Sequence, residues 1–165
     1  MTANVLAFSE GAHDHPLGPA GRVLLVDDAP GARAEIAAIL RRQGHEVREA
    51  GDGAEALAVI AEFRPDVTLM DVLMPGMGGI EACRRIRALH GPLDLPVIFV
   101  TGLDDPASRA RCWQAGGNDF LARPVSETEL SLRVANLVQL KKHHTLLARR
   151  AVELERTVAT RTAEV

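Results

Sequence analysis

The stretch Val67-Thr68-Leu69-Met70-Asp71 decides the fold of this chain, because an apolar run ends in a carboxylate that opens a loop rich in Pro and Gly, residues 73–79. A short, continuous apolar run bounded by turn residues is typical of a strand buried on both faces. The run Val23–Val26 ends in the same way, in Asp27 and Asp28. Open α/β sheets bind ligands at the carboxyl ends of their strands, so Asp71 is the first candidate functional residue.

The composition narrows the class of protein. The chain has 165 residues, with 47% apolar and 25% charged side chains, which fits one globular domain with an appendage. It contains no Tyr and one Trp, so we expect an aliphatic core of the kind found where helices pack on a parallel sheet. The formal net charge of −3 gives no electrostatic case for nucleic-acid binding. The sequence contains no apolar run long enough to span a membrane and no signal peptide, so we expect a cytoplasmic protein.

Strand-like runs recur along the chain with room for one helix between each pair. They are Val23–Val26, Glu46–Ala50, Val67–Met70, Pro96–Val100 and Asn118–Ala122. The segments between them repeat apolar residues at helical spacing. This alternation predicts an α/β fold with a doubly wound, five-stranded parallel sheet, because right-handed crossovers place helices on both of its faces. The run Glu46–Ala50 is more polar than the others and is expected at an edge of the sheet.

Turn and capping residues bound the expected helices. Gly44 can terminate the first helix, Pro65 follows the second, and Gly91-Pro92 follows the third. The fourth helix is expected to open at Asp105-Pro106, since Asp caps helices and Pro fits their first turn, and to close at Gly116-Gly117.

After Pro124 the chain has no further Gly or Pro, and we expect a single helix that reaches Val165. Ser126 and Glu129 fit a capping box at its start. At 1.5 Å per residue the helix would be about 58 Å long, so only its first turns can lie on the domain.

An apolar seam with alternating spacings of three and four runs along this helix, interrupted by His144 and Arg161. Its large apolar members are Leu137, Leu140, Leu147, Leu154 and Val158. We expect a parallel coiled-coil homodimer, because an isolated helix with such a seam needs a partner to bury it. The alternative is a solvated helix that frays beyond about residue 145.

Placed side by side, the strand ends gather five polar residues in one crevice: Asp27, Asp28, Asp71, Thr101 and Arg123. Carboxylates this close together are costly unless a cation is bound or one of them reacts. Carboxylates, a loop carbonyl and waters form the octahedral oxygen site that suits Mg²⁺. Asp71 would then stay ionised as a nucleophile that can form an aspartyl phosphate. Thr101, Arg123 and the N–H groups of the loop Leu73–Gly76 would face the phosphoryl oxygens.

Four pieces of the sequence, in this order and spacing, resemble the CheY-like receiver domain of bacterial two-component response regulators. They are Val23-Leu24-Leu25-Val26-Asp27-Asp28, Asp71-Val72-Leu73-Met74-Pro75-Gly76-Met77, Val100-Thr101-Gly102 and Gly116-Gly117-Asn118-Asp119-Phe120-Leu121-Ala122-Arg123-Pro124. The resemblance covers roughly Gly21–Asn136, and it implies a flavodoxin-like sheet with the strand order 2-1-3-4-5.

The resemblance also implies roles for single residues. Asp71 would accept a phosphoryl group from a histidine kinase or a phosphotransfer protein. Asp28 and Asp71 would bind Mg²⁺, with Asp27 helping through water and the Leu73 backbone carbonyl as a further ligand.

Thr101 would be the switch hydroxyl, and Phe120 would be the aromatic side chain that reorients with it. The family normally has Lys at the position of Arg123, which would bind the phosphoryl group. Arg keeps the charge, but it is longer, planar and more weakly hydrated than Lys. We expect phosphorylation of Asp71; the alternative is an atypical receiver that acts as a protein-interaction module with weak or no phosphorylation.

Leu73 and Leu103 lie two residues after Asp71 and Thr101, where side chains can border the path of a hydrolytic water. Because both are apolar, they motivate the hypothesis that the acyl phosphate is long-lived. An unchanged dephosphorylation rate after polar substitution would contradict it.

We expect three segments along the chain. Residues 1–20 form a flexible leader, whose His13-Asp14-His15 triplet is too small a set of ligands for a metal site. Residues 21–136 form the receiver, and residues 137–165 form a coiled-coil extension or linker. The extension resembles helical linkers that precede enzymatic output domains, so we expect the N-terminal part of a larger regulator; a stand-alone receiver is the alternative.

We expect the signal to be relayed by the surface that consists of the fourth helix, near Trp113, the fifth strand and the fifth helix.

Two other classes of protein fit the sequence less well. Phosphatases and phosphotransferases of the haloacid-dehalogenase kind carry a second Asp two residues after the nucleophile, where this chain has Leu73. We therefore expect a phosphoacceptor and no enzyme acting on external substrates. A DNA-binding regulator would need a helix-turn-helix, and none remains to be placed.

Cys83 and Cys112 have no CxxC spacing and are expected to be buried thiols.

Overall fold

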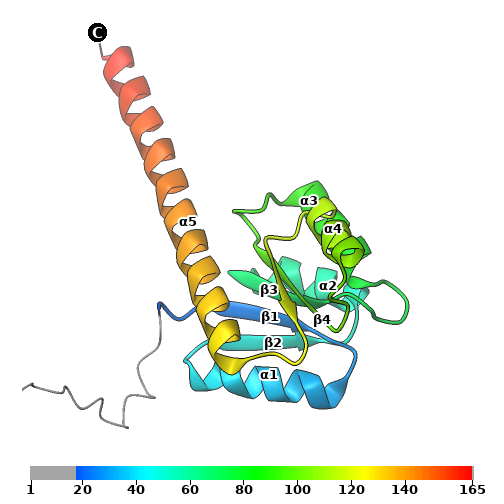
Figure 1. The fold of residues 1–165 in the computed structure, drawn as a ribbon. Helices are drawn as coiled ribbons and strands as arrows, with labels where there is room; N and C mark the ends of the chain where they lie inside the picture. The colour runs from blue at the N-terminus through cyan, green and yellow to red at the C-terminus, as the bar shows by residue number, and fades with distance from the viewer. Residues whose placement is uncertain (1–17, 165) are drawn as a thin grey trace, which may run out of the picture.

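The structure is a computed structural model, and it describes residues 18–164 of the chain. Strands and helices alternate along these residues (Figure 1). They are β1 Arg22–Val26, α1 Pro30–Arg42, β2 Glu46–Ala50, α2 Gly53–Phe63, β3 Val67–Asp71, α3 Gly79–Leu89, β4 Val97–Thr101, α4 Pro106–Gln114, β5 Asp119–Ala122 and α5 Glu127–Ala163. Most of the expected leader, with its His13-Asp14-His15 triplet, lies outside the described residues.

The five strands form one parallel sheet in the order β2-β1-β3-β4-β5. One face is covered by α1 and α5, and the other by α2, α3 and α4 (Figure 1). The predicted doubly wound sheet and its strand order are confirmed. The polar strand β2 lies at an edge, as its composition indicated, whereas the apolar strands β1, β3 and β4 lie inside the sheet.

Two apolar layers hold the helices on the sheet, because successive side chains of a strand point to opposite faces. Leu24 and Phe99 contribute to the layer under α2, α3 and α4, together with Ile86. Leu25 contributes to the layer under α1 and α5, together with Leu130. Each of these five side chains is at most 1% exposed. Helices are therefore packed firmly on both faces of the sheet.

Three boundaries of β3 and β4 differ from the prediction by one residue. β4 begins at Val97 and not at Pro96, because Pro has no N–H to donate to a ladder. β3 and β4 each extend one residue further than expected, to Asp71 and Thr101, since both still pair with the neighbouring strand. The two polar residues therefore belong to the ladder itself, which fixes their backbone positions.

The predicted helix caps are confirmed in part. The Asp105 side chain accepts from the Ser108 N–H at 2.8 Å, as expected at the start of α4. The Ser126 hydroxyl accepts from the Glu129 N–H at 3.4 Å at the start of α5. The Glu129 carboxylate accepts from Arg133 and does not close the expected capping box. The i,i+4 ion pair with Arg133 competes for that carboxylate.

The C-terminal segment is one continuous helix, as predicted. Its buried residues are confined to the first turns: Leu130, Ser131, Val134, Ala135 and Val138. Beyond them α5 projects away from the domain (Figure 1). Within residues 18–164, none of the helices combines the length and the apolar character that a membrane crossing requires.

Candidate functional site

The carboxyl edge of the sheet collects the polar residues that the sequence singled out. Asp27 follows β1, Asp71 and Thr101 end β3 and β4, and Arg123 follows β5. The Arg123 N–H donates to the Thr101 carbonyl oxygen at 2.9 Å. This bond keeps the ends of β4 and β5 together one residue beyond the ladder.

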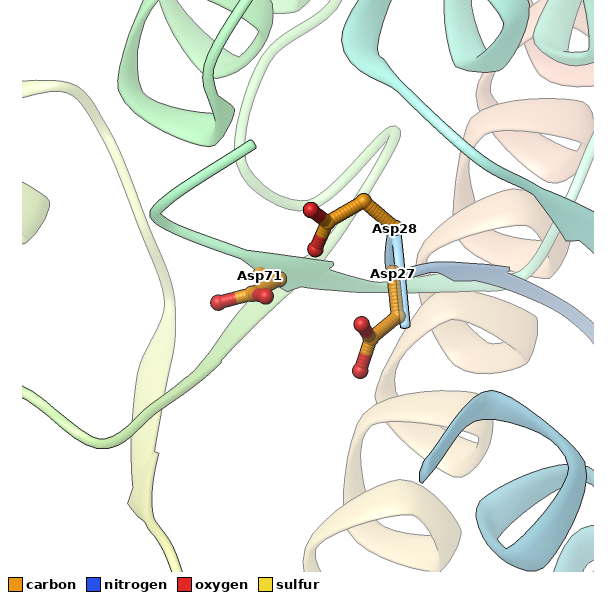
Figure 2. A group of neighbouring side chains, drawn as sticks. All are labelled: Asp27, Asp28 and Asp71. Atoms are coloured by element: carbon orange, nitrogen blue, oxygen red, sulfur yellow. The ribbon is translucent and has the colours of Figure 1, made fainter. Parts of the chain in front are cut away.

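Three carboxylates meet at this edge, from the ends of β1 and β3 (Figure 2). Asp27, Asp28 and Asp71 each bring a carboxylate oxygen within 4.8 Å of the others. Asp28 is exposed, Asp71 is partly buried, and Asp27 is only 1% exposed. Hard oxygen ligands suit Mg²⁺. The donor set therefore fits Mg²⁺, with Asp28 and Asp71 as its accessible carboxylates.

The Asp71 carboxylate is held in a setting that disfavours its ionised form. Burial raises the pKa of Asp71 above its ordinary value, and the nearby Asp27 raises this pKa further. Arg123 and the backbone N–H groups of Val72 and Leu73 offset the rise in part. Because added positive charge favours the ionised carboxylate, a bound divalent cation would increase the nucleophilic fraction of Asp71.

Arg123 forms its ion pair with Asp27, on the far side of β3. Its Nη2 contacts Asp27 Oδ2, and the Arg123 side chain is 27% exposed. The other oxygen, Asp27 Oδ1, accepts from the Ala29 N–H at 2.8 Å. Since β3 and β4 separate β1 from β5, Arg123 reaches across the ends of two strands to make this pair. The guanidinium therefore lies beside the group of three carboxylates formed by Asp27, Asp28 and Asp71.

The loop after Asp71 packs closely against the end of β3 at Gly79. A Cβ on Gly79 would lie 1.9 Å from the Asp71 carbonyl oxygen, so only Gly fits there. The Gly79 N–H donates to the Val72 carbonyl at 3.0 Å. The Gly53 N–H donates to the Met77 carbonyl at 3.2 Å and ties the loop to the start of α2.

Thr101 and Phe120, the expected switch residues, are connected through α4. Thr101 is 1% exposed, and its hydroxyl accepts from the Leu103 N–H at 3.2 Å. Phe120 packs partly buried against the core, and the Arg109 guanidinium carbon lies 4.9 Å from the centre of its ring. Arg109 Nε also donates to Asp104 at 2.7 Å. Arg109 therefore links Phe120 to the loop that follows Thr101.

Two residues around the site, Arg33 and Arg109, were not foreseen from the sequence. Arg33 of α1 donates to the Asp27 carbonyl oxygen at 2.7 Å and pairs with Glu49 of β2 at 3.2 Å. Each of the two joins its own helix to a partner on another element. No local pattern signals such contacts, because a helix-face Arg is most often solvated.

The expected dimer seam lies partly on the domain. Leu137 packs against the core and is partly buried. The remaining seam residues are exposed: Leu140 by 43%, Leu147 by 64%, Leu154 by 66% and Val158 by 63%. The unpartnered part of the seam therefore begins at Leu140.

The two cysteines are free and buried, as expected. Burial raises the pKa of the Cys83 thiol to about 11. A thiol with such a pKa is almost fully protonated at neutral pH and is unreactive.

The fold and the edge define a class of protein, the CheY-like, doubly wound α/β domains with an acidic crevice at the carboxyl edge of the sheet. The family model "Response regulator receiver domain" matches residues 23–135. The chain belongs to this family, the receiver domains of two-component signalling.

The chain is similar to several known response regulators. The DNA-binding response regulator MtrA of Mycolicibacterium smegmatis is 35% identical over 113 residues, which are 68% of this chain and 48% of MtrA. The response regulator PleD of Caulobacter vibrioides is 37% identical over 120 residues, which are 73% of this chain and 26% of PleD. The crystal structure of a response regulator from Chloroflexus aurantiacus matches with a TM-score of 0.68 and 37% identity, over 73% of this chain and 99% of that one. The chain thus spans less than half the length of these two curated relatives.

Proposed function

We propose that Asp71 accepts a phosphoryl group from a histidine kinase or a phosphotransfer protein, and that the chain relays this signal in the cytoplasm without acting on external substrates. The observation that carries the proposal is the meeting of Asp71 with Asp27 and Asp28 at the carboxyl edge of a receiver-family sheet. Asp71 is partly exposed, so a donor can reach it.

The chemistry assigned to these residues is a single displacement at phosphorus. An oxygen of Asp71 forms the new bond to phosphorus while the bond to the donor's imidazole nitrogen breaks, and the imidazole keeps the electron pair. Asp28, Asp71 and the Leu73 carbonyl would hold Mg²⁺, which would supply positive charge to stabilise the phosphoryl oxygens. The Arg123 guanidinium and the Thr101 hydroxyl act on the same oxygens as cation and hydrogen-bond donor.

The test is incubation with MgCl₂ and acetyl phosphate, followed by intact-mass measurement. Wild type is expected to gain one phosphoryl group, and Asp71→Asn or excess EDTA is expected to abolish the gain. Asp66→Asn is the matched control, because Asp66 lies at the other edge of the sheet, where it accepts from the Arg22 N–H at 2.8 Å. Unlabelled wild type, or equal labelling of Asp71→Asn, would contradict the proposal.

We further propose that Leu73 and Leu103 prolong the life of the acyl phosphate by keeping water from it. Leu73 is 63% exposed in the loop after Asp71, and Leu103 packs partly buried against the core after Thr101. Leu73→Asn with Leu103→Asn is expected to speed the loss of phosphate measured by intact mass. Leu89→Asn, at a side chain 81% exposed at the end of α3, is the control. Equal rates in all three proteins would refute this part.

The proposed output surface consists of α4, β5 and α5. Trp113 is 58% exposed on α4, and Arg109 connects α4 with Phe120 of β5. Phosphorylation would bias this surface between two arrangements. We divide the chain into a receiver over 21–136 and a dimerising helical extension over 137–165, and we assign the output to a larger regulator. The greater lengths of MtrA and PleD support that assignment.

A further inference from the structure

Asp27 differs from the other two carboxylates in having a partner for each oxygen. Oδ1 accepts from the Ala29 N–H at 2.8 Å, and Oδ2 is paired with Arg123. The side chain is 1% exposed, whereas the neighbouring Asp28 is exposed. In Figure 2 the side chains of these adjacent residues diverge from the end of β1. Asp27 is thus the carboxylate that an ion from solvent reaches least easily.

The partner of Asp27 is the Arg123 guanidinium, a planar and delocalised cation. The acidic group is therefore joined by one positive charge, which is paired with one of its three carboxylates. Both residues of the pair make a further hydrogen bond, since the Arg123 backbone N–H donates to the Thr101 carbonyl and Asp27 Oδ1 accepts from the Ala29 N–H. The pair is consequently preorganised, and separating it leaves Asp27 buried without a counter-charge.

The length of the Arg side chain matters for this arrangement. Neighbouring strands lie about 4.8 Å apart, and two strands separate β1 from β5. Arg presents several N–H groups in a rigid fork at the end of a long stem, whereas Lys ends in a compact ammonium that remains strongly hydrated. Arg at position 123 therefore suits a contact with the far carboxylate, Asp27, across the ends of β3 and β4.

We propose that Arg123 is an internal counter-cation that withholds Asp27 from Mg²⁺, so that this receiver binds Mg²⁺ more weakly than its carboxylates would otherwise allow. The inference rests on the proposed function, because it concerns the same metal site. It makes Arg123 a positioning residue in the metal-free protein. It also leaves Asp28 and Asp71 as the two carboxylates available to the ion.

Calorimetric titration of the full chain with MgCl₂ tests this inference without any phosphoryl transfer. Arg123→Gln frees Asp27, so we expect at least about tenfold tighter binding, since a unit charge a few ångströms away in a partly desolvated site is strongly felt. The double variant Arg123→Gln/Asp27→Asn removes both charges and is expected to return within about threefold of wild type. Arg33→Gln removes an equal charge that contacts only the Asp27 backbone carbonyl and Glu49, and it is expected to stay within about threefold as well.

Three results would overturn the inference. They are Mg²⁺ binding by Arg123→Gln that is no tighter than wild type, equal tightening in Arg33→Gln, and a double variant as tight as Arg123→Gln alone. If Arg123→Gln does not fold, NMR of the wild-type Arg123 guanidinium decides: its hydrogen-bonded N–H signals should persist at Mg²⁺ saturation, and their loss contradicts the inference. Failure of the proposed function is distinguishable, because it appears as wild type that takes no phosphoryl group from acetyl phosphate.

Discussion

At the scale of single residues, His45 is a buried imidazole at the amino edge of the sheet. Its side chain is 8% exposed, and Nδ1 accepts from the Gly21 N–H at 3.1 Å. Burial lowers the pKa of His45 below its ordinary value of 6.5, although Asp66 offsets part of the effect. The unfolded chain therefore takes up a proton at a higher pH than the folded protein does. Stability is complete above about pH 6.5 and falls as the pH drops toward the folded pKa.

The measurement for His45 is urea denaturation at pH 7.5 and at pH 5.5. We expect wild type to lose stability between these two values, and His45→Gln to lose measurably less. His143→Gln, at an exposed position of α5, is expected to behave as wild type does. A His45→Gln protein with the full wild-type pH dependence would show that other groups cause the loss.

Thr68, unlike His45, is a buried polar residue whose side chain makes no hydrogen bond among the described residues. Its side chain is completely buried in β3, and its hydroxyl has no hydrogen-bond partner among residues 18–164. Thr68→Val keeps the shape and removes the hydroxyl, so we expect a gain of about 1 kcal/mol in the free energy of unfolding. Thr68→Ser keeps the hydroxyl and loses a methyl group, so we expect a loss of about 1 kcal/mol. Loss of stability in Thr68→Val would point to a hydrogen bond through a buried water.

At the scale of elements, two helix-start glycines have opposite surroundings. Gly79 opens α3 with its Cα against the Asp71 carbonyl, whereas a Cβ on Gly31 of α1 would meet nothing within 4 Å. We expect Gly79→Ala to lower the free energy of unfolding by about 3 kcal/mol, because the loop has to move away from β3. Gly31→Ala is expected to raise the free energy of unfolding by about 0.5 kcal/mol, because Ala lowers the conformational entropy of the unfolded chain. Equal effects in chemical denaturation would contradict the close approach at Gly79.

Arg87 joins α3 to the segments before β4 and β5 through hydrogen bonds that the sequence pattern of the helix does not predict. It lies on α3 and donates to the Leu95 carbonyl at 2.7 Å, to the Gly116 carbonyl at 2.8 Å and to Asn118 Oδ1 at 2.8 Å. Asn118 Oδ1 also accepts from the Val97 N–H at 2.8 Å. These bonds join α3 to the starts of β4 and β5. They therefore help to position the two strands that carry Thr101 at the end of β4 and Arg123 directly after β5.

At the scale of the whole molecule, α5 combines an anchored start with an unpartnered continuation. The last buried residue of the helix is Val138, and the exposed seam begins at Leu140. A chain that stops after His143 is expected to keep the receiver fold, because the removed residues contribute little to the core. We expect sedimentation to show a dimer for the full chain and a monomer for the shortened one.

Substitution inside the full chain controls for the change in length. Leu147→Lys with Leu154→Lys places charges on the seam, and this variant is expected to sediment as a monomer with unchanged circular dichroism of the receiver. Val152→Lys is the matched control, because Val152 is 47% exposed and lies off the seam. A dimer that survives both the shortening and the seam charges would place the contact elsewhere.

Much of the fold was predictable because it depends on short-range patterns. Central strands buried on both faces require continuous apolar runs, and β1, β3 and β4 show them. Errors of one residue arose where pairing continued into polar residues, at Asp71 and Thr101, or where Pro96 could not donate. The capping box failed for a similar reason, since Glu129 had a second available partner in Arg133.

The sequence by itself determined the parallel sheet, its carboxyl edge and the group of Asp27, Asp28 and Asp71 at that edge. These features follow from local periodicity and from where each apolar run stops. Only the tertiary structure decided that Arg123 pairs with Asp27 and that Arg109 lies over Phe120. The physical reason is that a long charged side chain chooses among partners that only the packed strand ends and helices bring within its reach.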